Sequence, residues 1–275
     1  MTGSRNMEDS RAPLLEHLIE FRSRLMRVFV AWIIGFIIAY LFKTQTYGFL
    51  MQPLVDAYGE GASEGRRLIY TSLPETFFTY IKLSLFVGFC IAFPVIAQQF
   101  YGFVAPGLYK NEKRIVLPYL FLSPVLFFAG MALAYYYVFP LAWKFFIGFE
   151  QLSGQGELPM AVVLEAKVSD YLALVMQLLI AFGLAFQLPV VLTLMARAGL
   201  VKAASLARTR KFALVGIVTV AAIFTPPDVI SQVALAVPLL ILYELSIVSC
   251  RLIEKKQKQD TDARHKMDSR EPDGV

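Results

Sequence analysis

Hydrophobic residues along this chain gather in six runs separated by more polar stretches. The runs cover residues 25–42, 76–97, 115–139, 171–195, 212–224 and 229–248. An α-helix of about 20 apolar residues is long enough to cross the hydrocarbon core of a bilayer. The runs do not alternate with a period of two, which is the pattern of a membrane β-barrel. The sequence therefore predicts an all-α integral membrane protein with six transmembrane helices.

The fifth run, 212–224, is shorter than the others and precedes Thr225-Pro226-Pro227-Asp228. A helix of this length spans roughly 20 Å, against roughly 30 Å for a hydrocarbon core. Neither proline donates a backbone hydrogen bond, so this motif predicts a turn, and Asp228 is placed to cap the next helix. Two short helices at the C-terminal end are expected to thin the bilayer locally.

The two outer connections, 43–75 and 140–166, are long and contain aromatic and apolar residues. Connections of this kind are expected to pack as caps, and residues 45–58 of the first are predicted to form a short surface helix. Residues 253–275 are polar and are predicted to be a disordered tail. The remaining residues, 1–252, are then a single six-helix membrane domain.

The distribution of positive charge predicts the orientation of the chain. Most of the 26 Lys and Arg residues lie before the first run, between runs two and three, between runs four and five, or after the last run. Such residues concentrate on the cytoplasmic side of membrane proteins, which places both termini in the cytoplasm. The first residues are too acidic and polar for a signal peptide, so the first run is expected to be retained.

The composition narrows the classes of function. The chain is 57% hydrophobic and 17% charged, whereas soluble domains carry about 25% charged residues. The net charge of +5 is modest, and no basic-aromatic motif indicates nucleic-acid binding. The two cysteines and two histidines lack the spacing of a disulfide framework, a metal site or a nucleophile elbow. No enzymatic activity, metal or cofactor is therefore expected.

The amphipathic stretch Pro13–Arg24 runs directly into the first apolar run. Glu16, Glu20 and Arg24 are spaced by four residues and so share one face of a helix. Glu20 precedes Arg24 in the order that favours a helical ion pair. Two interpretations remain open: an interfacial anchor helix with a solvated face, or a carboxylate-bearing surface that receives a ligand.

A second acid, Glu112, follows an aromatic connection that contains Phe103. The predicted topology places Glu112 on the same side of the membrane as Glu20. Two carboxylates on one surface suit a ligand with two guanidinium groups, because each guanidinium can bind a carboxylate in bidentate fashion and lysine cannot.

Polar residues inside the apolar runs are costly and need partners. Lys82 is close enough to the outer end of its run to extend its ammonium group to the interface. Glu244 is expected to pair with Arg251 or to face the bundle. Gln187 precedes Pro189, and two interpretations stay open for its amide: it satisfies the carbonyl that the proline leaves free, or it lines a concave face inside the membrane.

Several motifs together resemble the TatC family, the receptor subunit of the twin-arginine translocase. They are, in chain order, the motifs at 15–25, 103–114, 130–135, 139–142 and 225–229. The likeness extends from about residue 10 to residue 252 and includes the six runs. It implies a concave bundle with periplasmic cap loops in the bacterial cytoplasmic (inner) membrane, with both termini inside.

The resemblance also implies a function. Members of this family bind twin-arginine signal peptides at the cytoplasmic face and help to export folded proteins with the proton-motive force. The partners implied are the signal peptides of folded cargo, TatB-like and TatA-like single-span subunits, lipid, and further copies of the chain in a receptor complex.

Individual residues take their implied roles from the matching motifs. The signal-peptide-binding residues would be Glu20, Glu112, Arg22, Arg24 and Phe103. Pro53, Gln187 and Asp228 would have structural or partner-contact roles. Many members carry Glu where this chain has Gln187. Because an amide does not titrate, a proton relay is not expected here, whereas hydrogen bonding to a partner helix is retained.

The main alternative is a small-molecule or ion transporter. Such a protein predicts paired charges on several helices and inverted internal repeats. The runs contain one interior amide, Gln187, and one lysine, Lys82, and no clear repeat. The pattern favours a receptor subunit over a transporter or a membrane enzyme.

Overall fold

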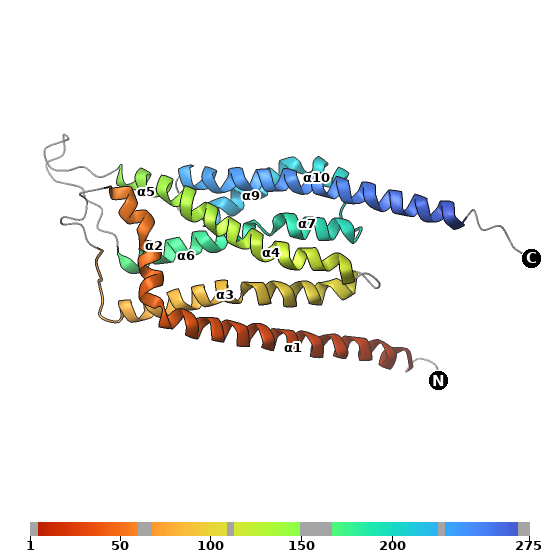
Figure 1. The fold of residues 1–275 in the computed structure, drawn as a ribbon, viewed down its shortest axis with the longest axis horizontal. Coiled ribbons are helices and arrows are strands. Elements are labelled where there is room, and N and C mark those ends of the chain that lie inside the picture. The colour runs from red at the N-terminus through yellow and green to blue at the C-terminus, as the bar shows by residue number, and fades with distance from the viewer. Residues whose placement is uncertain (1–4, 60–67, 109–112, 149–166, 225–228, 269–275) are drawn as a thin grey trace, which may run out of the picture. The chain divides into compact units, whose positions relative to one another are not determined.

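The structure, a computed structural model of the chain, describes residues 5–59, 68–108, 113–148, 167–224 and 229–268 (Figure 1). The elements in chain order are α1 (Arg5–Leu41), α2 (Lys43–Tyr58), α3 (Glu75–Leu108), α4 (Lys113–Leu133), the π-helical turn η1 (Ala134–Val138), α5 (Phe139–Ile147), α6 (Val168–Ala185), α7 (Leu188–Arg197), α8 (Ala203–Arg208), α9 (Arg210–Phe224) and α10 (Val229–Asp268). Within these residues the repeating structure is helical, and one isolated bridge joins Ile69 to Lys167. The predicted all-α architecture is confirmed.

Five helical stretches of the described residues are long and apolar enough to cross a membrane. They are Leu18–Leu41, Glu75–Phe103, Pro118–Ile147, Val168–Arg197 and Gln232–Lys255. They correspond to five of the six apolar runs, so the chain is a helical membrane protein with several spans. The remaining run corresponds to α9, which has only 15 residues.

The polar stretch before the first run is part of the same helix as that run. α1 continues without a break from Arg5 to Leu41, as the helical spacing of Pro13–Arg24 predicts. The helix predicted at 45–58 is also confirmed as α2, and its place along the outer surface stays a prediction. Pro53 is buried inside α2 beside Leu50 and Leu54, and the hydroxyl of Tyr171 donates to the carbonyl of Leu50 at 2.8 Å.

The third apolar run extends beyond its predicted end at residue 139. The helix passes through η1 and continues as α5 to Ile147, so Pro140 lies within a helix and not in a loop. Phe139 N–H donates to the carbonyl of Ala134, five residues back. A proline normally clashes with the carbonyl four residues before it. The wider π turn just before Pro140 relieves that clash, and the helix continues.

The fourth run is interrupted near its middle. α6 ends at Ala185 and α7 begins at Leu188, with Pro189 in the first turn of α7. Gln187 N–H donates to Leu184, and the carbonyl of Gln187 accepts from Val191, both at 3.0 Å. Because proline is tolerated in the first turn of a helix, where its missing N–H costs nothing, the break falls just before it.

The sixth run begins at Val229, as predicted, but its helix is longer than predicted. α10 continues to Asp268, through most of the stretch expected to be disordered, so that boundary was wrong. The reason lies in the sequence: no glycine or proline occurs between residues 239 and 268, so nothing ends the helix where its composition becomes polar.

The chain divides into two compact units, residues 1–125 with 146–177, and residues 126–145 with 178–275. In the first unit α1 packs along α3. At the crossing, a Cβ on Gly35 would lie 2.6 Å from the carbonyl oxygen of Gly88, and a Cβ on Gly88 would lie 2.6 Å from the backbone nitrogen of Phe36. Two glycines therefore let the helix backbones touch, and Trp32 Nε1 adds a hydrogen bond to the carbonyl of Leu85 at 3.0 Å.

One end of the α1–α3 pair is aromatic. The ammonium group of Lys43 lies 4.1 Å from the ring centroid of Tyr40 and 5.7 Å from that of Tyr80. Tyr47 of α2 packs edge-on against Tyr80. Burial, with smaller contributions from Tyr70 and Tyr80, raises the pKa of Tyr47 to about 12. A tyrosine hydroxyl is already neutral at physiological pH, and the raised pKa keeps that of Tyr47 neutral in more alkaline solution as well.

Glu75, the first residue of α3, joins its helix by hydrogen bonds to residues 71–72 and to Ser169 at the start of α6. The carboxylate of Glu75 accepts hydrogen bonds from the backbone of Thr71, Ser72 and Ser169 and from the hydroxyl of Thr71. The ammonium group of Lys167 lies 3.7 Å away. Only 8% of Glu75 is exposed, so its charge is balanced by several donors within the protein.

In the second unit α10 packs against α7, α8 and α9. Tyr243 donates to the carbonyl of Leu206 at 2.8 Å, and Glu254 accepts from the first backbone N–H of α8, that of Ala203, at 2.7 Å. Glu244 pairs with Arg210 at 2.7 Å. Of the two alternatives expected for Glu244, pairing with Arg251 or facing the bundle, the first is not the contact found. The pairing with Arg210 of α9 could not be predicted from spacing within α10.

Replacing Gly88 with alanine is expected to destabilise the protein. The new Cβ would meet the backbone of Phe36, which cannot move aside as a flexible side chain can. Overpacking of this kind costs about 1–3 kcal/mol. The thermal unfolding midpoint in detergent should fall relative to that of Gly48→Ala, because a Cβ at this helical glycine meets nothing within 4 Å. Equal midpoints would contradict the close crossing.

Candidate functional site

The charged turn of α1 places Glu20 and Arg24 in direct contact. Nε and Nη2 of Arg24 donate to Oε1 of Glu20 at 2.9 and 2.7 Å. The four-residue spacing puts both side chains on one face, and the predicted ion pair is confirmed. The Arg24 side chain is 22% exposed and that of Glu20 is 39% exposed. The Arg24 side chain is thus mostly covered, whereas more of the Glu20 side chain faces solvent.

The far edge of the Arg24 guanidinium lies against the C-terminal end of α3. Nη1 makes a long hydrogen bond, 3.5 Å, to the backbone carbonyl of Gln99. Next along α3, the ring of Phe103 packs against that of Phe21, with centroids 5.5 Å apart. The structure therefore brings together Glu20, Arg24 and Phe103, three of the predicted site residues, although Phe103 is distant from the others in sequence.

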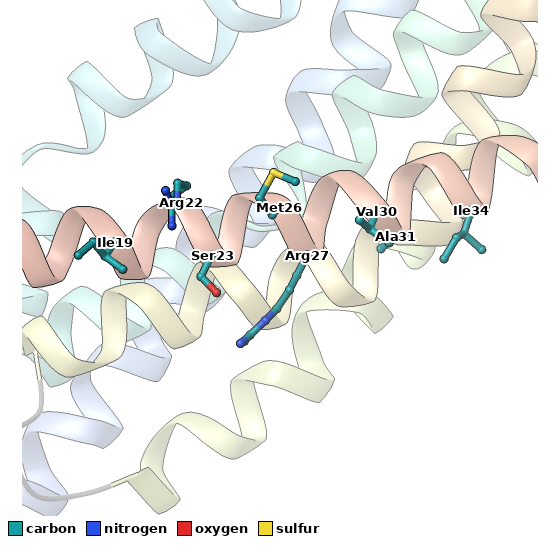
Figure 2. A pocket seen from close by; sticks show the side chains of 8 residues that line it. All are labelled: Ile19, Arg22, Ser23, Met26, Arg27, Val30, Ala31 and Ile34. Carbon is teal, nitrogen blue, oxygen red and sulfur yellow. The ribbon is translucent and has the colours of Figure 1, made fainter.

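Arg22 lies on a different side of α1. Its side chain is exposed and lines a shallow groove along α1 (Figure 2). The groove is formed by Ile19, Arg22, Ser23, Met26, Arg27, Val30, Ala31 and Ile34. Two residues of separation turn a side chain by about 200° around a helix, so Arg22 points away from Glu20. The structure does not bring Arg22 into the Glu20–Arg24 contact.

The other predicted residues lie elsewhere in the chain or outside the described part. Glu112 and Asp228, together with the predicted turn at 225–228, are outside the described residues. Pro53 is buried in α2 of the first unit. Gln187 is buried at the junction of α6 and α7 in the second unit, with 9% of its surface exposed. Lys82 is exposed on α3.

Two features of the site were missed by reasoning from the sequence. They are the backbone carbonyl of Gln99 and the bare Cα of Gly102, both in contact with Arg24. Every residue has a backbone carbonyl, so the identity of a residue does not show which carbonyl will accept a hydrogen bond. Gly102 precedes Phe103 in a stretch that was predicted to be a connection, but it lies within α3. A glycine inside an apolar helix next to Phe103 is the signal that could have indicated a close contact.

The chemistry available here is ionic and apolar contact. The carboxylate of a partly exposed glutamate side chain is bound by a guanidinium, and the phenyl rings of Phe21 and Phe103 pack together nearby. Such a surface suits a cationic ligand that also carries apolar groups. Within the described ranges, no three His, Cys, Asp or Glu side chains are grouped to hold a metal ion.

Comparison with known proteins gives a consistent result. The family model described as "Sec-independent protein translocase protein (TatC)" matches residues 16–238. The Sec-independent protein translocase protein TatC of Rickettsia prowazekii is 48% identical over 239 residues, which cover 87% of this chain and 92% of the relative. The protein of the same name from Escherichia coli K12 is 37% identical over 246 residues, 90% of each chain.

Solved structures give the same match. A crystal structure of the twin arginine translocase receptor TatC superimposes with a TM-score of 0.73 at 40% sequence identity. The match covers 86% of this chain and 99% of that chain. A second crystal structure, of the receptor in the detergent DDM, gives a TM-score of 0.72 at 41% identity. The likeness therefore extends over almost the whole of both solved chains.

A pair of cysteines tests the contact between α1 and α3. Phe21→Cys with Phe103→Cys should be joined efficiently by a short bifunctional thiol reagent in membranes, because the native rings lie 5.5 Å apart between centroids. Arg22→Cys with Phe103→Cys is the matched control, and it should react much less. The native Cys90 and Cys250 are buried and should contribute little. Equal crosslinking of both pairs would contradict this geometry.

Proposed function

The chain belongs to the TatC family of Sec-independent protein translocase proteins, and we propose that Glu20, held by Arg24, and Glu112 together bind the arginine pair of twin-arginine signal peptides. Membership of this family makes it a non-enzymatic membrane protein of the translocase. It also favours protein transport over the alternative of a small-molecule or ion transporter. The proposal concerns which residues of this chain receive the peptide, and how.

The observation that carries the proposal is the partly exposed side chain of Glu20, whose carboxylate is paired with Arg24 near the end of a membrane-spanning stretch. An arginine binds a carboxylate through two parallel hydrogen bonds, and this geometry distinguishes arginine from lysine. The site is partly hydrated, so the net gain from one ionic contact is small. Two such contacts and an apolar contact are therefore needed for useful affinity.

Glu112 is the proposed second carboxylate. In sequence it lies between the last residue of α3 and the first residue of α4, nine positions after Phe103. The resemblance of residues 103–114 to the family's motif supports the proposal that it shares a recognition surface with Glu20. Phe103, packed on Phe21, would provide an apolar surface for the residues that flank the arginine pair.

Arg24 and Arg22 have different proposed roles. Arg24 holds the Glu20 carboxylate and therefore acts through it. Arg22 is exposed above an apolar stripe of α1, where it would contact a more distant part of the peptide or the lipid headgroups. This difference follows from their positions on opposite sides of the same turn.

We further propose six spans, with α9 as the short fifth, and both termini on the cytoplasmic side of the bacterial inner membrane. The charge asymmetry of the connections supports this orientation. The partners would be TatB-like and TatA-like single-span subunits and further copies of the chain, with export driven by the proton-motive force. Pro53, Gln187 and Asp228 are the proposed structural or partner-contact positions.

Removing either carboxylate should weaken peptide binding. Glu20→Gln and Glu112→Gln are each expected to lower the affinity of purified protein for a fluorescent twin-arginine signal peptide by roughly tenfold, the effect of losing one charge-assisted pair. Wild-type protein should also bind a twin-lysine peptide more weakly than the twin-arginine peptide. Asp56→Asn is the matched control, since Asp56 is an exposed acid on α2. Unchanged affinity in Glu20→Gln would remove this residue from the site.

Thiol labelling tests the proposed orientation. Leu73→Cys, before α3, should react with a membrane-impermeant maleimide in spheroplasts, because Leu73 is fully exposed and belongs to an outer connection. Leu200→Cys, between α7 and α8, is also exposed and should react only after permeabilisation. The reverse pattern would contradict the proposed orientation.

A further inference from the structure

The guanidinium of Arg24 lies directly over Gly102. A Cβ built on Gly102 would be 2.6 Å from Nη1, 3.4 Å from Cζ and 3.6 Å from Nη2 of Arg24. The first distance is too short for any real contact, so no residue with a side chain can occupy position 102 while Arg24 keeps its place. At Gly102, α3 therefore has no side chain between its backbone and the guanidinium, and the carbonyl of Gln99 lies beside the same group.

The same guanidinium faces Glu20 with its other edge. Nη1 is directed at α3, whereas Nε and Nη2 bind Oε1 of Glu20. Arg24 therefore connects a surface of α3 to the carboxylate. An isolated ion pair between residues four apart on an exposed helix samples several rotamers and contributes little. Contact with α3 restricts the Arg24 rotamer and, through it, the position of the carboxylate.

We propose that Gly102 is a positioning residue for signal-peptide recognition. Because Gly102 has no side chain, the guanidinium of Arg24 fits against α3 at a position that we call the Arg24 seat. Held in this seat, Arg24 fixes the Glu20 carboxylate where an arginine of the signal peptide binds. This inference rests on the proposed function, in which Glu20 binds an arginine of the peptide. Its physical basis is preorganisation, because rotamer entropy lost before binding is not lost again when the peptide arrives.

The effect should depend on the ligand. A guanidinium binds a carboxylate through two hydrogen bonds with a fixed relative orientation, so it needs the carboxylate in one position. A lysine ammonium is a compact charge that adapts to several positions. Disturbing the seat should therefore reduce arginine binding more than lysine binding, and so reduce selectivity. A general loss of structure would reduce both.

Gly102→Ala in the full-length protein is the first test. The clash involves the far end of a flexible side chain, so the protein should fold while Arg24 leaves its place. Affinity for a twin-arginine peptide should fall about tenfold, and affinity for a twin-lysine peptide by less than about twofold. Gly216→Ala is the control, a helical glycine with nothing within 4 Å of the new Cβ. Equal losses for both peptides, or no loss, would overturn the proposal.

A double-mutant cycle makes the test specific to Arg24. Arg24→Lys keeps the positive charge but lacks Nη1, the atom nearest to Gly102. In that background Gly102→Ala should change twin-arginine affinity by less than about twofold. A tenfold loss in both backgrounds would show that Gly102 acts without Arg24. If Arg24→Lys binds the peptide too weakly to measure, the ratio of twin-arginine to twin-lysine affinity in the single variant Gly102→Ala decides whether the proposal holds.

The Glu20→Gln variant separates the two possible failures. Normal binding by Glu20→Gln would refute the proposed function and this inference with it. Weak binding by Glu20→Gln together with normal binding and selectivity in Gly102→Ala would refute only the inference. The elution profile of each variant in detergent identifies any that fail to fold.

Discussion

The close, antiparallel crossing of α1 and α3 determines where the charged turn of α1 lies. The contacts between the two helices keep a nearly constant register: Gly35 with Gly88, Arg24 with Gly102, and Phe21 with Phe103. Lys43, at the start of α2 just beyond the end of α1, continues it by lying near the ring of Tyr80. Where Gly35 meets Gly88 the backbones touch, so the crossing tolerates little sliding. A rigid helix transmits that constraint over several turns, and Arg24 therefore meets a fixed residue of α3.

The surroundings of two acids in the first unit explain why one has a structural role and the other suits a ligand. Glu75 accepts several hydrogen bonds from nearby backbone and hydroxyl groups and lies close to Lys167, and it is 8% exposed. Glu20 is bound by the side chain of Arg24 and is 39% exposed. Displacing donors around Glu75 would leave a buried charge, which is costly. Glu20, with the more exposed side chain, is therefore the acid of the two that we propose as a ligand-binding residue.

Features set by local composition were predictable from the sequence, and features set by contacts between distant residues were not. The helical runs follow from apolar length, and the Glu20–Arg24 pair follows from a four-residue spacing. The contact of Arg24 with Gly102 depends on the crossing of α1 and α3. No pattern of spacing or composition in a single sequence shows which residues of two helices meet at such a crossing. The continuation through Pro140 was missed because a π turn, unlike a proline, has no simple residue signature. The Glu112 part of the site lies outside the described residues and stays a prediction.

The position of Gln187 is set by the backbone, and this limits what its side chain does. Pro189 forces the break between α6 and α7, and the backbone of Gln187 is hydrogen-bonded on both sides of that break. Either Gln or the Glu expected in many relatives would be held at the same buried junction. Only the acid can titrate, whereas both can accept a hydrogen bond. A proton relay at position 187 is therefore not expected in this chain, and hydrogen bonding to a partner helix stays the proposed role of Gln187.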